Sequence, residues 1–428
     1  MIAGVLFGGL TALIILGMPI AFALGMSTLL AVLAQGLPSV AVAQKLLAGA
    51  DSFPLMAIPF FLLAAELMTS GALAEVLLRF AAMLVGHKRG GLGYTNILTI
   101  TFFSGISGSA LADAAGPGAI LIRMMRQSGY PAPYAAALTA TTSMVGPIIP
   151  PSIIMIIYAL QDDSVSVLDL FLAGVIPGLM ISGSLVLYNF WESRRRHFRA
   201  EGTSPTLPTV LRQGWRALPA LMLPVLIVGG VHGGVFTPTE ASVAAVFYAL
   251  ACGFLVYHTL TFAMLPAILA RAAFLSAAVL LIVAMSSAFA WVLTVVQVPQ
   301  ALSQWIGSLG LPPLGFLLAI NVFLLLFGIF IEPLPAVMVL APILAPMAAS
   351  LGIDPTHFAI IVIVNLTIGM ITPPVGGLLF ITALVAKVSM SELNRELWPM
   401  LALQIVVLAL ITLVPAFSLA LPHWLGGP

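Results

Sequence analysis

The stretch VGPIIPPSII (residues 145–154) places three prolines within five residues, in one of the most apolar parts of the chain. Proline has no backbone N–H and its ring clashes with the preceding turn, so this run must interrupt a helix. If the helix crosses a membrane, the freed backbone groups find no water, and each costs several kcal/mol unless protein satisfies it. The break is therefore expected to be buried in protein or to line a cavity.

The composition of the whole chain indicates a membrane protein. Of the 428 residues, 61% are hydrophobic and 7% are charged, whereas a soluble domain has about 25% charged residues. Apolar runs long enough to cross a bilayer recur along the chain, for example at residues 3–17, 170–190, 314–331 and 397–421. We therefore expect an all-α polytopic membrane protein, embedded in a lipid bilayer.

The composition also argues against several other classes of protein. The net charge is +1 and no basic domain is present, so no nucleic-acid partner is expected. Cys252 is the only cysteine, which excludes an intrachain disulfide, and the six histidines are scattered. An intramembrane enzyme would need a catalytic constellation at membrane depth, such as a Ser–Lys dyad, and none is found.

The basic residues predict the orientation in the membrane. Residues 192–216 hold six of the fifteen Lys and Arg residues, so the positive-inside rule makes this segment a cytoplasmic loop. Residues 161–169, one span upstream, carry three acidic residues and no basic one. We expect this second loop on the outer, periplasmic side.

A second stretch, IGMITPP (368–374), aligns with VGPIIPP (145–151) and repeats its glycine and its tandem prolines. In each half, a hairpin too short to cross the membrane twice is expected before a long proline-broken helix. The hairpins are predicted at 95–127 and 314–349, and the broken helices at 131–160 and 356–385.

The charges place the ends of the first hairpin inside the cell and those of the second outside. The halves, residues 1–191 and 217–428, are thus predicted to be inverted repeats. Interrupted helices in corresponding positions of such repeats point to a transporter binding site. Hairpins that close from opposite sides favour alternating access over a channel.

Polar residues gather at the expected hairpin turns. Asp113 lies just beyond the first turn, where it could cap the returning helix or serve a site. Glu332 lies at the second turn, where it could bind a cation, hydrogen-bond a substrate, titrate as a coupling group or cap a helix. Hydroxyl and carbonyl oxygens without histidine or thiol suit a hard monovalent cation such as sodium.

A third motif, GGVHGGVFTPTEAS (229–242), is interpreted as a glycine-rich turn into a capped helix. Thr237 or Thr239 would be the N-cap, with Pro238 and Glu240 in the first turn.

The chain resembles the large membrane subunit, of the DctM or SiaM type, of tripartite ATP-independent periplasmic (TRAP) transporters. The resemblance runs from LGMPIAFALG (16–25) to the last span. Its most specific parts are FSGISGSALADAAGPG, the GYP…TATTSMVGPIIPPSI segment, GGVHGGVFTPTEAS and the NLTIGMITPPVG segment.

The resemblance implies a sodium-coupled importer of organic acids, such as C4-dicarboxylates or sialic acid, in the bacterial inner membrane. It also implies an elevator mechanism, in which the hairpins and broken helices move against a scaffold.

The resemblance implies two or more sodium ions, held where the hairpins meet the broken helices. One site would use Ser104, Gly105, Ser107, Gly146 and Pro150, and the other Gly328, Asn365, Gly369 and Thr372. The substrate would lie between them, near Ser107, Ser109, Thr142, Ser143 and Glu332.

The resemblance also implies two partners. A soluble periplasmic binding protein (DctP or SiaP type) would deliver the substrate, and a small membrane subunit (DctQ or SiaQ type) would complete the complex. The chain begins directly with the large-subunit repeat, so we expect the small subunit to be a separate polypeptide. The alternative is a stand-alone sodium-coupled carboxylate transporter or exchanger of related fold, without a binding protein.

Overall fold

The structure, a computed structural model, describes residues 2–70, 73–198, 200, 205–308 and 312–425. Within these ranges the regular secondary structure is helical, apart from one isolated bridge between Arg89 and Ala200. Seven described helical segments are long and apolar enough to span a membrane. They are Phe53–Ser70, Val167–Arg195, Leu207–His232, Pro238–Val256, Phe262–Val295, Pro333–Ser350 and Met390–Leu413. The predicted all-α polytopic fold is confirmed.

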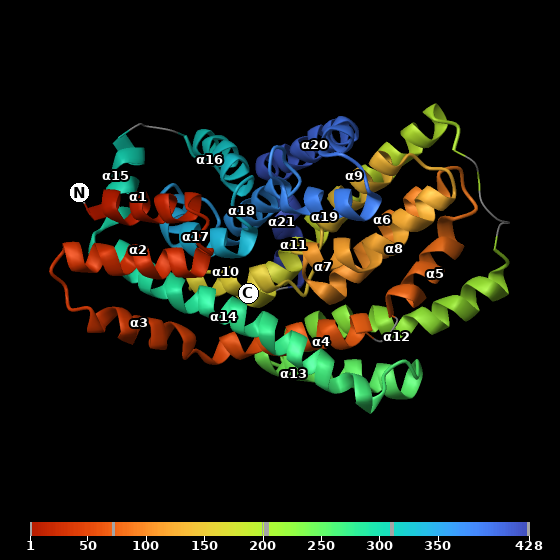
Figure 1. Cartoon of the computed structure of the whole chain (residues 1–428), viewed down its shortest axis with the longest axis horizontal. Coiled ribbons are helices and arrows are strands. Elements are labelled where there is room, and N and C mark those ends of the chain that lie inside the picture. The colour runs from red at the N-terminus through yellow and green to blue at the C-terminus, as the bar shows by residue number, and fades with distance from the viewer. Residues whose placement is uncertain (1, 71–72, 199, 201–204, 309–311, 426–428) are drawn as a thin grey trace.

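One group of helices, which we name the scaffold layer, lies mostly along the lower side of Figure 1, with only its first helix higher, above the second. It consists of α1 (Ile2–Ile15), α2 (Ile20–Ala34), α3 (Val40–Ala50), α4 (Ala57–Ser70), α12 (Leu207–His232), α13 (Pro238–Ala251) and α14 (Leu265–Val295). The long helix α14 packs against α2, α3 and α4. Small residues allow this close approach, since Gly49 of α3 lies directly against Ser287 of α14.

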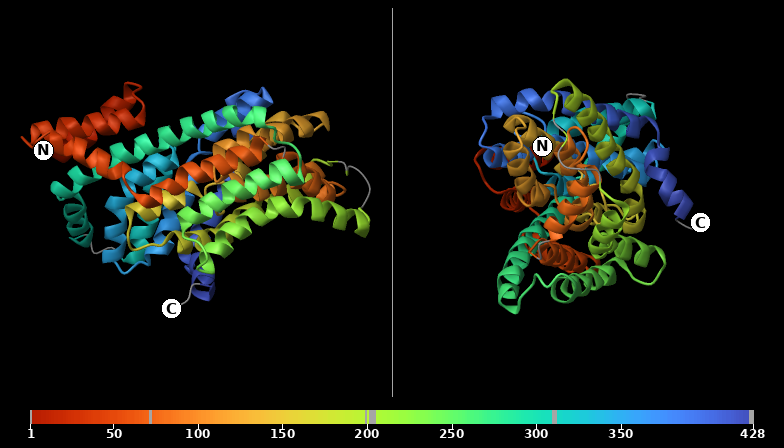
Figure 2. Two further views of the ribbon diagram at one scale, coloured as in Figure 1. Left: turned by 90° about the horizontal axis from the view of Figure 1, so that it is seen from below. Right: turned by 90° about the vertical axis from the view of Figure 1, so that its right-hand side faces the viewer.

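The remaining helices form a second layer, the hairpin layer, above the first (Figures 1 and 2). Its first part comprises α6 (Gly91–Ser107), α7 (Ala110–Ala115), α8 (Pro117–Gln127), α9 (Ala132–Ser143), α10 (Ile153–Gln161) and α11 (Val167–Arg195). Its second part comprises α16 (Pro313–Gly328), α17 (Pro333–Ser350), α18 (Pro355–Gly369), α19 (Gly377–Ala386), α20 (Met390–Leu413) and α21 (Ala416–Leu425). Helix α5 (Leu73–Val85) packs on both α6 and α12, and α15 (Val298–Ser308) packs on α17.

Both tandem-proline stretches lie between helices. Helix α9 ends at Ser143 and α10 begins at Ile153, and the Pro150–Pro151 bond in the break is cis. Ser152 stabilises this break, because its hydroxyl donates to the Pro147 carbonyl (2.6 Å) and accepts from the Met155 N–H (3.3 Å). The Pro147 carbonyl in the break and the Met155 N–H at the start of α10 thus find a partner in the same side chain.

The second break has the same form. Helix α18 ends at Gly369 and α19 begins at Gly377, and the Pro373–Pro374 bond is cis. Each break is preceded in the chain by helices that turn back on each other: α6 with α7 and α8 before the first break, and α16 with α17 before the second. The inverted relation between the two halves stays a prediction.

The segment predicted as a loop over residues 192–216 is mostly helical. Helix α11 continues to Arg195 and α12 begins at Leu207. The extension of α11 is stabilised from within, because the buried Glu192 carboxylate pairs with Arg196 one turn later. The prediction, which was based on the density of charged residues alone, therefore made the loop longer than the segment between α11 and α12.

The glycine-rich turn into a capped helix is confirmed. Thr237 is the N-cap of α13, and its side chain accepts from the Glu240 N–H at 3.3 Å. The Glu240 carboxylate accepts from the Thr237 N–H at 2.8 Å, which completes the capping box.

Arg196 joins α11 to α20 through a partly buried ion-pair network. Its guanidinium binds Glu192 and forms two hydrogen bonds with Glu396, at 3.1 and 2.6 Å. It also lies over the Tyr134 ring, 5.2 Å from the centroid. Burial alone lowers the pKa of Arg196, but the two carboxylates outweigh burial and raise this pKa above its usual value.

Arg196→Met is expected to destabilise the protein by about 3 kcal/mol, because it leaves the Glu192 carboxylate buried beside only the distant Arg195 (3.7 Å). The measurement is the melting temperature of the purified protein in detergent. Arg194→Met is the control, since Arg194 lies over the Phe190 ring and forms no ion pair with a described residue. Equal melting temperatures for the two variants would contradict this role for Arg196.

Candidate functional site

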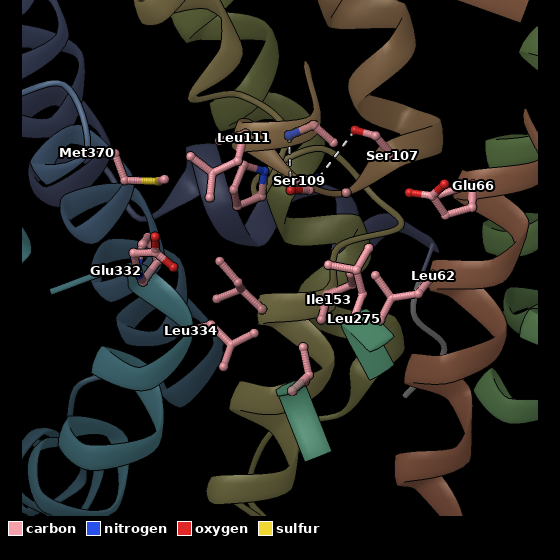
Figure 3. A pocket seen from close by; sticks show the side chains of 18 of the residues that line it. Leu62, Glu66, Ser107, Ser109, Leu111, Ile153, Leu275, Glu332, Leu334 and Met370 are labelled. Atoms are coloured by element: carbon pink, nitrogen blue, oxygen red, sulfur yellow. Dashed lines mark hydrogen bonds between the residues drawn. The ribbon is translucent and has the colours of Figure 1, made fainter. Parts of the chain in front are cut away.

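A cavity of about 250 Å³ lies between the two layers, at the tip of each hairpin. Figure 3 shows that α4 of the scaffold layer lines one side of it, and the hairpin layer the other. Its wall is mainly apolar, and its polar side chains are Glu66, Thr69, Ser107, Ser109 and Glu332. The cavity thus has one wall from each layer.

Three of the five predicted substrate-binding residues line this cavity: Ser107, Ser109 and Glu332. Ser109 is the N-cap of α7, and its oxygen accepts from the Ala112 N–H at 3.4 Å. A hydroxyl carries one donor and two acceptor positions, so Ser109 keeps its proton for a ligand. Glu332 precedes α17, and its carboxylate caps no helix. It faces the cavity from the side opposite the two serines (Figure 3).

The structure does not bring the other two predicted residues, Thr142 and Ser143, to the cavity. Thr142 is fully buried in α9, where its hydroxyl donates to the Leu138 carbonyl at 2.8 Å. The Ser143 hydroxyl is also buried, with no hydrogen-bond partner among the described residues. Helix α9 is buried on every side, so its sequence lacks the alternation of apolar and polar residues that would show which way Thr142 and Ser143 point.

A first cluster of oxygen atoms lies behind the tip of the first hairpin. The Asp113 carboxylate is fully buried and accepts from Ser104 Oγ at 2.7 Å and from Ser107 Oγ. Gly146, in the first helix break, lies so close that a Cβ there would be 2.7 Å from Asp113 Oδ2. The predicted cation-site residues Ser104, Ser107 and Gly146 are therefore brought together, around an aspartate that the predicted set left out.

Backbone carbonyls of the first break approach the same hairpin. The Pro150 carbonyl would lie 3.5 Å from a Cβ on Gly105, and the Pro151 carbonyl 2.6 Å from a Cβ on Gly108. Gly108 adopts a left-handed φ of 60°, which a side chain would disfavour. Glycine at these positions allows the hairpin turn to contact the unwound segment directly.

The Asp113 carboxylate has no cationic side chain to neutralise it: no Lys, Arg or His of the described chain forms an ion pair with it. A buried, unpaired carboxylate is costly, and two serine hydroxyls only partly compensate. A cation bound beside Asp113 would remove the imbalance. No group of three or more His, Cys, Asp or Glu side chains suited to a metal occurs in the described residues.

A second cluster lies where α16 meets α18. Gly328 and Gly369 are in backbone contact, and a Cβ on Gly328 would be 3.2 Å from Gly369 Cα. Asn365, one turn before Gly369, is fully buried, and its Oδ1 has no hydrogen-bond donor among the described residues. Thr372 lies in the break just beyond, where its hydroxyl donates to the Ile368 carbonyl at 2.8 Å. The cluster offers an unpaired amide oxygen close to a helix C-terminus, where backbone carbonyls lack partners.

Several known proteins similar to this chain are named as transport proteins. Residues 7–417 match the model of a family described as "Tripartite ATP-independent periplasmic transporter, DctM component". The C4-dicarboxylate TRAP transporter large permease protein DctM of Rhodobacter capsulatus is 39% identical, over 100% of both chains. The sialic acid TRAP transporter large permease protein SiaM of Vibrio cholerae is 39% identical, over 99% of both. The 2,3-diketo-L-gulonate TRAP transporter large permease protein YiaN of Escherichia coli is 36% identical, over 99% of this chain and 98% of that protein.

A solved structure has a similar fold. The crystal structure of the YdaH transporter of Alcanivorax borkumensis superposes with a TM-score of 0.64, covering 90% of this chain and 89% of that one. The two sequences are 16% identical, so the likeness concerns the fold alone.

Proposed function

Because the chain belongs to the DctM family of TRAP transporter large permease subunits, we propose that it imports an organic acid across the bacterial inner membrane, driven by sodium. Membership of this family confirms the resemblance found in the sequence, and makes the chain a multi-pass transport protein rather than an enzyme. The coupling ion, the chemical class of the substrate and the mechanism are the content of the proposal.

The observation that carries sodium coupling is the environment of Asp113. Its buried carboxylate has hydroxyl donors but no basic partner among the described residues, and it faces the first helix break. A monovalent cation held by carboxylate, hydroxyl and carbonyl oxygens would neutralise it. We assign the first sodium to this cluster, with Ser104, Ser107 and the region of Gly146. We assign a second sodium to the cluster of Gly328, Asn365 and Gly369.

The cavity supports an organic acid of modest size. Its volume of about 250 Å³ lies below the roughly 300–1,000 Å³ of sites for drug-sized ligands. Among the described residues, its lining includes no Lys or Arg, so an anion would depend on hydroxyls and on the positive charge of bound sodium. The names of the three relatives above give C4-dicarboxylate, sialic acid and 2,3-diketo-L-gulonate, which are all carboxylic acids.

Transport would proceed by movement of the hairpin layer against the scaffold layer. The cavity has walls from both layers, so such movement would carry the substrate past α4 and α14. A periplasmic binding protein would deliver the substrate and a separate small membrane subunit would pack in the bilayer beside this chain. Residues 161–169 would face the periplasm and residues 192–216 the cytoplasm.

Uptake of a pooled set of labelled organic acids into proteoliposomes tests this proposal. The chain is reconstituted with its small subunit, with and without the binding protein, under an inward sodium gradient or an equal potassium gradient. Uptake is expected only with both sodium and the binding protein, because one supplies the driving force and the other the substrate. Sodium-driven uptake by the chain alone would instead favour the stand-alone carrier.

A further inference from the structure

Three buried side chains form a hydrogen-bonded relay from the second oxygen cluster to α20. Asn365 Nδ2 donates to Asn321 Oδ1 at 2.8 Å, and Asn321 Nδ2 donates to Thr412 Oγ1 at 2.9 Å. The Thr412 hydroxyl donates to the Leu408 carbonyl at 2.9 Å. The exposed fractions of the three side chains are 7% or less. The relay therefore connects α18, α16 and α20 inside the hairpin layer.

The Leu408 carbonyl, at the α20 end of the relay, determines which group donates and which accepts in each hydrogen bond. The Leu408 carbonyl can only accept, so it takes the single proton of the Thr412 hydroxyl. Thr412 then has only acceptor positions left, and Asn321 must turn its NH2 group toward it. The oxygen of Asn321 is thereby turned toward Asn365, which must present its own NH2 group in turn.

These donor and acceptor roles leave the side-chain oxygen of Asn365 without a donor from the relay. Both hydrogens of its NH2 group have acceptors, since Nδ2 also donates to the Ile361 carbonyl at 2.7 Å. Oδ1 is buried and receives no hydrogen bond from a described residue. A buried oxygen in this state is suited to a cation and unsuited to an anion.

Asn365 lies one helical turn from the glycine contact between α16 and α18. Asn365 and Gly369 are one turn apart on α18, and so share a face of that helix. Asn321 and Gly328 are two turns apart on α16, on the face that meets α18. The Leu366 carbonyl also approaches this contact, 3.2 Å from a Cβ built on Gly328. From α16, the Gly328 carbonyl oxygen lies 2.6 Å from a Cβ built on Gly369, so backbone oxygen atoms of both helices lie at this contact.

We propose that Asn321 and Thr412 are positioning residues that hold the Asn365 amide with its oxygen toward the second cation site. This inference rests on the proposed function, because it takes that site to bind sodium. Without the relay, only the hydrogen bond to the Ile361 carbonyl orients the amide, so its oxygen is held less firmly and the NH2 group, which repels a cation, turns toward the site more often. The relay thus sets the sodium affinity of the site without any contact between Asn321 or Thr412 and the ion.

The test compares the sodium dependence of uptake in Thr412→Val and in the wild-type protein. Valine has almost the volume of threonine but lacks the hydroxyl that orients Asn321. The sodium concentration for half-maximal uptake is expected to rise roughly ten-fold, as for other residues that orient metal ligands. Maximal uptake and the KM for the acid at saturating sodium are expected to stay unchanged. Thr412→Ser keeps the hydroxyl and is expected to behave as the wild type.

Two further variants make the result specific. Thr382→Val, in α19, removes a buried hydroxyl whose partners among the described residues are the Leu378 and Leu379 carbonyls, and should leave the sodium dependence unchanged. Asn321→Leu removes the middle of the relay and should shift the sodium dependence further than Thr412→Val. If Asn321→Leu does not fold, as judged by gel filtration, Thr412→Val decides the question.

A binding measurement separates positioning from stability. Sodium is expected to raise the melting temperature of the wild-type protein in detergent, and Thr412→Val should shift this rise to higher sodium concentrations. A merely structural role would lower the melting temperature equally at every sodium concentration. Sodium-driven uptake with the same sodium dependence in wild type and Thr412→Val would overturn the relay and leave the proposed function intact. Wild-type uptake that needs no sodium would overturn both.

Discussion

Asp113→Asn is expected to abolish sodium-driven uptake while the protein still folds. Asparagine has nearly the shape of aspartate and can still accept the hydroxyl of Ser104 or Ser107, but it carries no charge. Loss of one charge of a buried pair costs about 3–5 kcal/mol, and each 1.4 kcal/mol is tenfold in affinity. We therefore expect sodium to bind the first cluster roughly 100-fold or more weakly.

The measurement is uptake into proteoliposomes as a function of sodium concentration, together with the melting temperature of the purified variant. Asp163→Asn is the matched control, because it removes an exposed carboxylate in the loop at 161–169, outside the helices. Asp113→Ala should be at least as inactive, since it also leaves both serine hydroxyls without their acceptor. Unchanged sodium dependence in Asp113→Asn would show that the carboxylate is not a ligand of the coupling cation.

The positions of the helix breaks could be predicted from the sequence because proline acts locally. The tandem prolines 150–151 and 373–374 lie between helices, whereas single prolines such as Pro177 and Pro399 are accommodated within helices. The capping box at Thr237 is local in the same way. The loop at 192–216 was predicted too long because charged residues also continue helices when they form ion pairs one turn apart.

The site could be predicted only in part, because side-chain direction depends on packing. The sequence left Asp113 open between a helix cap and a site, and the structure makes Ser109 the cap and buries Asp113 behind it. Thr142 and Ser143 lie on a helix buried on every side, where hydrophobic periodicity is lost. Asn321 was not selected at all, although a lone amide within the apolar helix 313–328 is a signal of an interhelical hydrogen bond.

Glu332→Gln is the second substitution with a large expected effect. Glu332 lies at the second hairpin tip, where its carboxylate faces the cavity and forms no ion pair with a described residue. The described lining of the cavity also holds Glu66, but Glu66 is paired with Arg271 at 2.9 Å. The charge of Glu332 is therefore the one that a bound ion, a proton or a substrate group must balance.

Glutamine keeps the length and the hydrogen-bonding oxygen of Glu332 but removes that charge. Truncating a buried charge pair costs about 2–5 kcal/mol, so uptake at fixed sodium and substrate is expected to fall roughly 30-fold or more. Glu75→Gln is the control, since Glu75 pairs with Arg79 on the exposed surface of α5. Normal uptake by Glu332→Gln would remove this residue from the site.

The way in which Glu332→Gln fails assigns its role among the three that the geometry allows. A higher sodium concentration for half-maximal uptake, at unchanged KM for the acid, would place the carboxylate on the coupling cation. A higher KM for the acid at saturating sodium would place it on the substrate. A loss of pH dependence at saturating sodium and substrate would make it a proton-coupling group. The three outcomes can be told apart because sodium, the acid and pH are varied one at a time while the other ligands are held constant. A change in the response to one of them then identifies the ligand that Glu332 contacts.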